Sequence, residues 1–155
     1  MGNAIKEING NLFDSHCFTY INPVNCIGDM GAGIAIGFKM RFPKYYEDYR
    51  GECLRKGIDI GMLYLYDNGM SDKFSPGQIC SFPVKKHWKE NSKIEWIEKG
   101  LLLIMEYADT LKSIAIPAVG CGCGGLNWDK IRVLIHDILS NYPMRVELYM
   151  PWGKR

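Results

Sequence analysis

Two glycine-rich loops, each between a strand-like and a helix-like segment, constrain most strongly what this chain can fold into. The first, residues 28–33, follows the apolar segment 18–24 and precedes the helix-like segment 34–42. The second, residues 120–125, lies between the segments 113–119 and 128–139. Glycine lets a ligand approach the backbone closely, and the amino end of a following helix attracts anions. Two such loops predict one diphosphate-containing ligand held between them.

The rest of the chain alternates strand-like and helix-like segments. Further strands are expected at residues 4–8, 62–66, 78–83 and 145–149. Helices are expected at residues 44–56, with Gly57 as the C-terminal cap, and from a capping-box pattern at Ser92 and Glu95 to about Ala108. This order predicts an α/β fold in which helices cover both faces of a mostly parallel sheet. In such sheets ligands bind beyond the carboxyl ends of the strands, where both glycine loops and Lys85 would lie.

Composition narrows the class of protein. The 155 residues are 47% apolar, which predicts a single domain over residues 1–155 with a substantial core. A net charge of +2 argues against nucleic-acid binding through bulk charge, although a local basic surface stays compatible with it. We find no signal peptide and no apolar run long enough to span a membrane, so we expect a cytoplasmic protein.

The cysteine pattern does not indicate a metal site. The six cysteines are expected to be reduced thiols. Cys121 and Cys123 are separated by one residue instead of the usual two, and no histidine–cysteine cluster accompanies them. We therefore expect neither a metal nor a cofactor.

The first glycine loop matches neither common phosphate-binding fingerprint. It lacks the lysine that follows a P-loop, and the residues after Gly33 break the dinucleotide-binding pattern. Taken alone, it is also compatible with a simple tight turn.

Both loops resemble the ligand loops of the macrodomain family. Residues 22–35 read NPVNCIGDMGAGIA and residues 116–128 read IPAVGCGCGGLNW, in the family's order and at a plausible separation. Within the family the chain most resembles the branch of the DarG antitoxin and the terminal ADP-ribose protein glycohydrolase. The resemblance implies a three-layer α/β/α fold with a central mixed, mostly parallel sheet. It also implies ADP-ribose or an ADP-ribosylated substrate as ligand, and a monomer.

The resemblance places two asparagines at opposite ends of the ligand. Asn11 would meet the adenine and Asn25 the distal ribose. Asn11 is equally typical of a turn, and Asn25 could instead bond to its own loop. The residues implied to contact ADP-ribose are Asn11, Leu12, Asn22, Asn25, Gly28, Met30, Gly31, Ala32, Gly33, Ile34, Pro117, Gly120, Cys121, Gly122, Cys123, Gly124, Gly125 and Leu126.

The segment 82–88, FPVKKHW, resembles the one that carries the catalytic lysine of the DarG-like branch, at Lys85. That amine could form a Schiff base with C1″ of the open-chain ribose, or protonate or stabilise the departing group. Without the resemblance, Lys85 and Lys86 would read as a solvated basic rim. At Gly124 the terminal glycohydrolase has an aspartate, whereas the DarG-like branch has glycine and acts on ADP-ribosylated thymidine in DNA. Asp29 is a further candidate for a carboxylate beside the lysine.

Three functions follow as hypotheses. The first is a glycohydrolase that removes ADP-ribose from a modified target, above all ADP-ribosylated DNA. There the basic and aromatic segment 85–89 could contact phosphates and stack a base on Trp88, although Trp88 could equally serve packing. The second is a protein that binds ADP-ribose without turnover. The third is a hydrolase of small derivatives such as ADP-ribose 1″-phosphate or O-acetyl-ADP-ribose.

Overall fold

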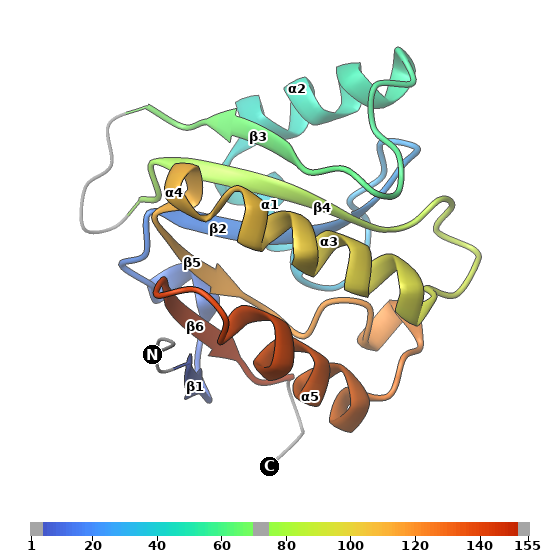
Figure 1. The fold of residues 1–155 in the computed structure, drawn as a ribbon. Helices are drawn as coiled ribbons and strands as arrows, with labels where there is room; N and C mark the ends of the chain where they lie inside the picture. Colours follow the sequence, from blue (N-terminus) through green and yellow to red (C-terminus); the bar gives the residue numbers. More distant parts are fainter. Residues whose placement is uncertain (1–4, 70–74, 152–155) are drawn as a thin grey trace.

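The protein is built around one six-stranded sheet with the strand order β1-β6-β5-β2-β4-β3 (Figure 1). The computed structural model describes residues 5–69 and 75–151. The strands are β1 Ile5–Ile8, β2 Thr19–Asn25, β3 Tyr64–Asp67, β4 Gln78–Lys85, β5 Ser113–Ile116 and β6 Arg145–Tyr149. The helices are α1 Ile34–Arg41, α2 Pro43–Leu54, α3 Ile94–Glu106, α4 Ala108–Leu111 and α5 Trp128–Leu139, with short 3₁₀ turns η1 Leu12–Asp14 and η2 Gly122–Gly124.

The sheet is mixed and mostly parallel, as predicted. β2 pairs in parallel with both β4 and β5, β6 pairs in parallel with β5 and β1, and β3 alone runs antiparallel, against β4. The central strands are buried on both faces, because helices cover each side. The prediction of a three-layer α/β/α fold is confirmed.

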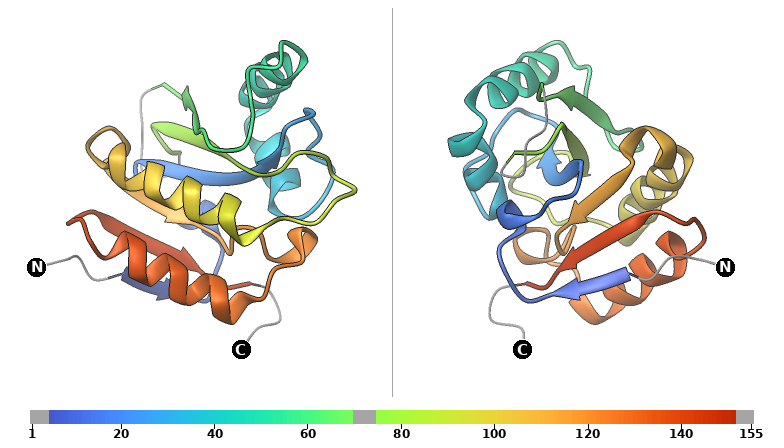
Figure 2. Two further views of the ribbon diagram at one scale, coloured as in Figure 1. Left: turned by 45° about the vertical axis from the view of Figure 1, so that its right-hand side comes forward. Right: turned by 90° about the vertical axis from the view of Figure 1, so that its left-hand side faces the viewer.

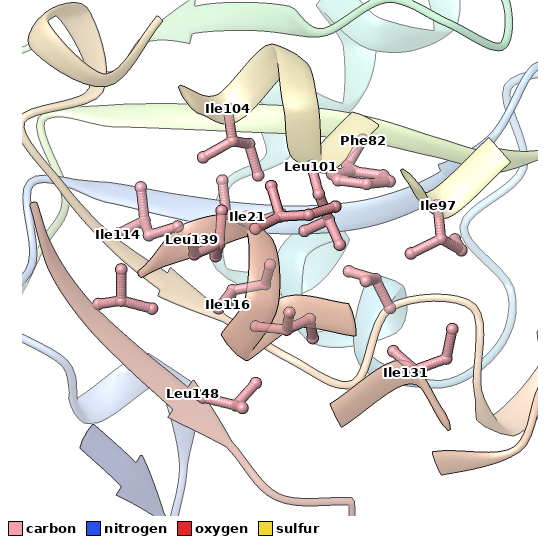
Figure 3. Close-up of a cluster of buried hydrophobic side chains, with 14 of the residues drawn as sticks. Ile21, Phe82, Ile97, Leu101, Ile104, Ile114, Ile116, Ile131, Leu139 and Leu148 are labelled. Atoms are coloured by element: carbon pink, nitrogen blue, oxygen red, sulfur yellow. The ribbon is translucent and has the colours of Figure 1, made fainter. Parts of the chain in front are cut away.

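Two cores hold the layers together. Between the sheet and the helices α3 and α5 lies an aliphatic core, shown in Figure 3. Ile97, Leu101 and Ile104 of α3 have no exposed surface there, and complete burial of each such side chain stabilises the fold by about 1.5–3 kcal/mol. On the opposite face, α1 and α2 enclose an aromatic core that includes Phe38, Tyr45 and Tyr49. Figure 2 shows the helices on the two sides of the sheet.

Three local predictions were wrong. Ser92 does not cap α3: the N-cap residue is Lys93, without a side-chain cap bond. α2 ends at Leu54, and the left-handed residue after it is Lys56 (φ 57°) instead of the predicted Gly57. The helix expected to run to about Ala108 ends at Glu106, and after Tyr107 the separate helix α4 begins at Ala108.

Several smaller expectations can be placed directly. Ala4, predicted as the start of the first strand, lies outside the described residues, as do residues 70–74 of the predicted polar loop. None of the six cysteines, all of which lie in the described residues, forms a disulfide bond. Within residues 5–69 and 75–151, no helix has the length and apolar character needed to cross a membrane.

Candidate functional site

Three loops meet at one edge of the sheet, beyond the carboxyl ends of its central strands. β5, β2 and β4 are neighbours and parallel. The first glycine loop follows β2, the segment after Lys85 follows β4, and the second glycine loop follows β5. Figure 1 shows these loops at the right, in blue, yellow-green and orange. This edge is where parallel sheets bind ligands, so the structure brings together the three segments that the sequence singled out.

A β-bulge places Lys85 directly beside Asn25. Val24 pairs with Pro83, but the next residue, Asn25, pairs with Lys85, so Val84 is the extra residue. Bulges of this kind redirect side chains next to functional sites. The amide of Cys26 then donates to the carbonyl of Lys86 at 3.2 Å and continues the pairing past the bulge. Two residues sixty positions apart in the chain thereby become neighbours.

The Lys85 side chain is buried and held by two carbonyl groups. Only 8% of the residue is exposed, and its Nζ donates to the carbonyl oxygens of Trp88 and Cys123, each at 3.0 Å. The second of these carbonyls belongs to the second glycine loop. The alternative of a solvated basic rim therefore describes the exposed Lys86 and not Lys85.

Asn25 organises the first glycine loop. Its Oδ1 accepts hydrogen bonds from the amides of Ile27 (3.1 Å) and Asp29 (3.3 Å), and its Nδ2 donates to the carbonyl of Asp29 (2.9 Å). The alternative in which this asparagine bonds to its own loop is thus what the structure shows. Tyr49 of α2 adds a support, since its hydroxyl donates to the Asn25 carbonyl at 2.8 Å and to Oδ1 at 3.0 Å. An amide nitrogen carries two hydrogens, so one of the Nδ2 hydrogens is still available to a ligand.

The first glycine loop presents an uncapped helix end. Gly31, Ala32 and Gly33 are exposed, and α1 starts at Ile34 with no side-chain bond from its N-cap, Gly33. Gly33 has φ 59° and ψ −147°, a conformation open essentially to glycine alone. No side-chain cap therefore pairs with the first amides of α1, and these amides point toward the loop, as they do in anion-binding sites.

The second glycine loop also offers backbone donors. The amides of Gly124, Gly125 and Leu126 bond to carbonyls inside the loop. Across the described chain, the amides of Gly122 and Cys123 make no such backbone bond, and both residues are exposed. The two loops thus present unpaired N–H groups from either side of the strand ends.

Ser92 ties the loop after Lys85 to the second glycine loop. Its amide donates to the Gly124 carbonyl at 2.8 Å, and its hydroxyl donates to the carbonyl of Val84, the extra residue of the bulge. A Cβ atom added at Gly124 would lie 3.1 Å from the Cβ of Ser92, so a side chain at position 124 would require Ser92 to shift. The sequence signal for Ser92 was misleading, because its spacing to Glu95 imitates a helix cap.

Several other expected ligand contacts have buried side chains. Leu12, Met30 and Asn22 are at most 2% exposed, and the Asn22 amide donates to the Tyr45 hydroxyl at 3.0 Å. In this conformation Asn22 supports the core under the loop instead of facing a ligand. Asn11 is exposed, and its side chain accepts from the amide of Phe13 at 3.0 Å, as a turn residue does.

The remaining expected contacts divide by exposure. Pro117, Gly120, Cys121 and Gly124 are buried, Gly125 is exposed and Leu126 is half-buried. Asp29, the candidate carboxylate, is exposed, and its side chain lies beside Gly31. Within the described residues Lys85 has no carboxylate partner: neither of its two bonds reaches Asp29.

One surface hollow borders the second glycine loop. It measures about 320 Å³ and is lined by Cys121, Gly122, Gly125, Leu126, Asn127, Trp128 and Pro151. A larger hollow of about 450 Å³ lies on the outer side of α5 and includes no residue of either glycine loop. Because the unpaired amides and Lys85 lie at the loops, we place the candidate site there. Residues 5–69 and 75–151 contain no group of three potential metal ligands.

Comparisons with known proteins identify relatives in sequence and in fold. The sequence model of the Macro domain matches residues 21–135. A DNA ADP-ribosyl glycohydrolase of Thermus aquaticus is 36% identical over 138 residues, which are 88% of this chain and 38% of that protein. The chain thus spans about two fifths of the length of this curated relative.

Two solved structures match nearly the whole fold. The macrodomain of Thermus aquaticus DarG has a TM-score of 0.88 at 35% identity, over 97% of this chain and 100% of that one. Thermosipho africanus DarTG in complex with ADP-ribose has a TM-score of 0.88 at 36% identity, over 96% of this chain and 42% of that one. The matched residues contain the first glycine loop, Lys85 and the second glycine loop, and the chain belongs to the Macro domain family.

Proposed function

We propose that this protein is an ADP-ribosyl glycohydrolase that binds ADP-ribose and removes it from ADP-ribosylated thymidine in DNA. The observation that carries the proposal is the position of Lys85. Lys85 pairs with Asn25 in the register of the sheet, and its amino group bonds to the second glycine loop. The names of the relative from Thermus aquaticus and of the ADP-ribose complex from Thermosipho africanus support both the ligand and the reaction.

The diphosphate would lie between the two glycine loops. On one side the uncapped first turn of α1 supplies amides and the positive end of a helix dipole. On the other side, the amides of Gly122 and Cys123 make no backbone hydrogen bond within the described residues. This position would carry the distal ribose toward the strand ends, where the second Nδ2 hydrogen of Asn25 can donate to a ribose hydroxyl.

Lys85 can act on the distal ribose in two ways. As an ammonium it has three donors, and the two carbonyls use two of them, so the third can protonate or stabilise the departing thymine nitrogen. As a neutral amine it would still donate both bonds, and its lone pair could attack C1″. In that case the bond from Nζ to C1″ forms as the bond from C1″ to the base breaks, and the base takes up the proton that the amine gives up. The C1″–O4″ bond of the ribosylated amine then breaks, which opens the ring to an imine, and water hydrolyses this imine to ADP-ribose and free lysine.

Among the described residues no carboxylate pairs with Lys85, which supports a DNA substrate over a protein substrate. The position that carries an aspartate in the terminal ADP-ribose protein glycohydrolase is Gly124, and Ser92 crowds the space that a side chain there would need. Asp29 does not substitute for it among the described contacts. A mechanism that pairs the lysine with an acid is therefore disfavoured.

A substrate panel tests the proposal. Wild type and Lys85→Ala would be compared on an ADP-ribosylated thymidine oligonucleotide, an ADP-ribosylated protein and ADP-ribose 1″-phosphate, with ADP-ribose binding measured by calorimetry. We expect wild type to release ADP-ribose from the oligonucleotide and Lys85→Ala to bind ADP-ribose but release none.

Other outcomes would select the alternatives. Binding of ADP-ribose without turnover of any substrate would leave a binding protein, and cleavage of the phosphate alone would leave a hydrolase of small derivatives. Treatment with cyanoborohydride during turnover separates the two roles of Lys85, because it traps a covalent adduct only if an imine forms. The monomeric state and the cytoplasmic location stay predictions.

A further inference from the structure

The loop between β4 and α3 exposes a tryptophan at the mouth of the candidate site. Trp88 is 51% exposed, in contrast to the packing role that the sequence left open. The loop itself is well tied: Oε1 of Glu90 accepts from the amides of Lys86 (2.8 Å) and His87 (3.1 Å), and the Lys89 amide donates to Nδ1 of His87 (3.1 Å). The exposed ring is therefore presented by an ordered turn.

One lysine side chain and one imidazole ring lie close to the Trp88 ring. Lys89 Nζ lies 5.2 Å from the centre of the Trp88 ring, and the His87 ring lies 5.5 Å from it at 33°. Lys86 is exposed on the same loop. The one carboxylate of this turn, Glu90, accepts both amide hydrogen bonds through Oε1. Two lysines against one glutamate leave the turn with a small excess of positive charge beside the exposed ring.

Trp88 also lies next to Lys85, the proposed catalytic residue. The main-chain carbonyl of Trp88 accepts from Lys85 Nζ, while the Trp88 ring faces solvent. A strand whose modified nucleotide reached Lys85 would therefore run next to the loop that carries this ring. Exposed aromatic rings with lysines on either side are typical of proteins that bind single strands, because every base can stack and every phosphate is anionic.

We propose that Lys86, Trp88 and Lys89 form a binding platform for single-stranded DNA, on which Trp88 stacks with a base next to the modified nucleotide. Lys86 and Lys89 contact the flanking phosphates. Single-stranded DNA fits because a duplex keeps the faces of its bases stacked and the target base inside. The inference rests on the proposed function, since it assigns the substrate class of the same site.

The test compares two substrates of different size. Wild type and Trp88→Ala would be assayed on an ADP-ribosylated single-stranded oligonucleotide and on ADP-ribosylated thymidine nucleoside, which has neither a neighbouring base nor the phosphates of a DNA backbone. We expect the ratio of kcat/KM for oligonucleotide to kcat/KM for nucleoside to fall by about 5- to 150-fold, the range for loss of one stacked base. Trp88→Phe should restore most of the ratio.

Two lysine variants test the phosphate contacts, and one distant aromatic variant serves as the control. Lys86→Gln and Lys89→Gln should each reduce the slope of log affinity against log salt by about 0.7, the value for one single-strand phosphate contact. Tyr107→Ala is the matched aromatic control, because Tyr107 is 43% exposed and lies at the far end of α3, at the opposite edge of the sheet. It should leave the ratio of the two substrates unchanged.

Binding of an unmodified single-stranded oligonucleotide, followed by anisotropy, separates this inference from the proposed function. Weaker binding by Trp88→Ala supports the platform even if wild type cleaves neither substrate, a result that would refute only the glycohydrolase. Equal binding by wild type and Trp88→Ala, or an equal loss of activity on oligonucleotide and nucleoside, would overturn the platform. Preference for an ADP-ribosylated protein over the oligonucleotide would overturn it as well.

Discussion

Ser92→Ala is the substitution whose consequences can be worked out most fully from the structure. The Ser92 hydroxyl is buried and donates to the carbonyl of Val84, the extra residue of the bulge that sets Lys85 beside Asn25. Removing it leaves a buried carbonyl without that donor, which costs about 1–3 kcal/mol of unfolding free energy. We therefore expect the denaturation midpoint to fall by a corresponding amount, measured by urea unfolding.

The same substitution should also slow the reaction. If the bulge relaxes, Lys85 moves relative to the ribose, and a shift of about 1 Å can reduce the rate by about 100-fold. Single-turnover assays on an ADP-ribosylated oligonucleotide measure this step. The matched control is Ser81→Ala in β4, the strand that contains Val84, because the Ser81 hydroxyl hydrogen-bonds to Tyr45 instead of to the bulge. It should lower stability similarly and leave the rate unchanged. A Ser92→Ala protein that is destabilised but reacts at the wild-type rate would refute the link between the bulge and Lys85.

Three further predictions concern the loop supports and acid stability. Gly28→Ala should lower the unfolding free energy by about 1–2 kcal/mol in thermal denaturation, since Gly28 has φ 88°, and an unchanged melting temperature would argue against that backbone. Tyr49→Phe should weaken ADP-ribose binding in calorimetry, because it removes both bonds that hold Asn25, and unaltered affinity would show that Asn25 needs no support. The hydrogen bond from Arg132 lowers the pKa of Glu7 from its ordinary 4.5. The free energy of unfolding that Glu7→Gln removes should therefore be largest above pH 4.5 and should vanish as the pH falls through the lowered pKa. A difference in urea unfolding that does not depend on pH would contradict this expectation.

The sequence predicted the architecture well because its signals are local. The apolar runs of β2 and β4 and the spacing of Ile97, Leu101 and Ile104 each identify an element from neighbours in the chain. The alternation of strands and helices then predicts the layers. The errors at Ser92 and Gly57 concern single residues at helix ends. Ser92 bonds to Val84 instead of capping α3, and Lys56 instead of Gly57 adopts the left-handed conformation.

The candidate site was only partly predictable, because its geometry depends on contacts between distant segments. Without the resemblance, the sequence places Lys85 in an exposed position at a strand end. In the structure Lys85 is buried, and its Nζ donates a hydrogen bond to the carbonyl of Cys123, thirty-eight residues later in the chain. The pairing of Asn25 with Lys85 depends on a bulge that no local pattern marks. Tyr49 belongs to a helical stripe typical of packing, so its bonds to Asn25 carry no sequence signal.

The most direct test of the account is release of ADP-ribose from an ADP-ribosylated single-stranded oligonucleotide under single-turnover conditions, at protein concentrations that saturate binding. We predict release by wild type and none by Lys85→Ala, with both proteins binding ADP-ribose in calorimetry so that loss of folding is excluded. Release by Lys85→Ala at the wild-type rate would contradict the assignment of the chemistry to Lys85.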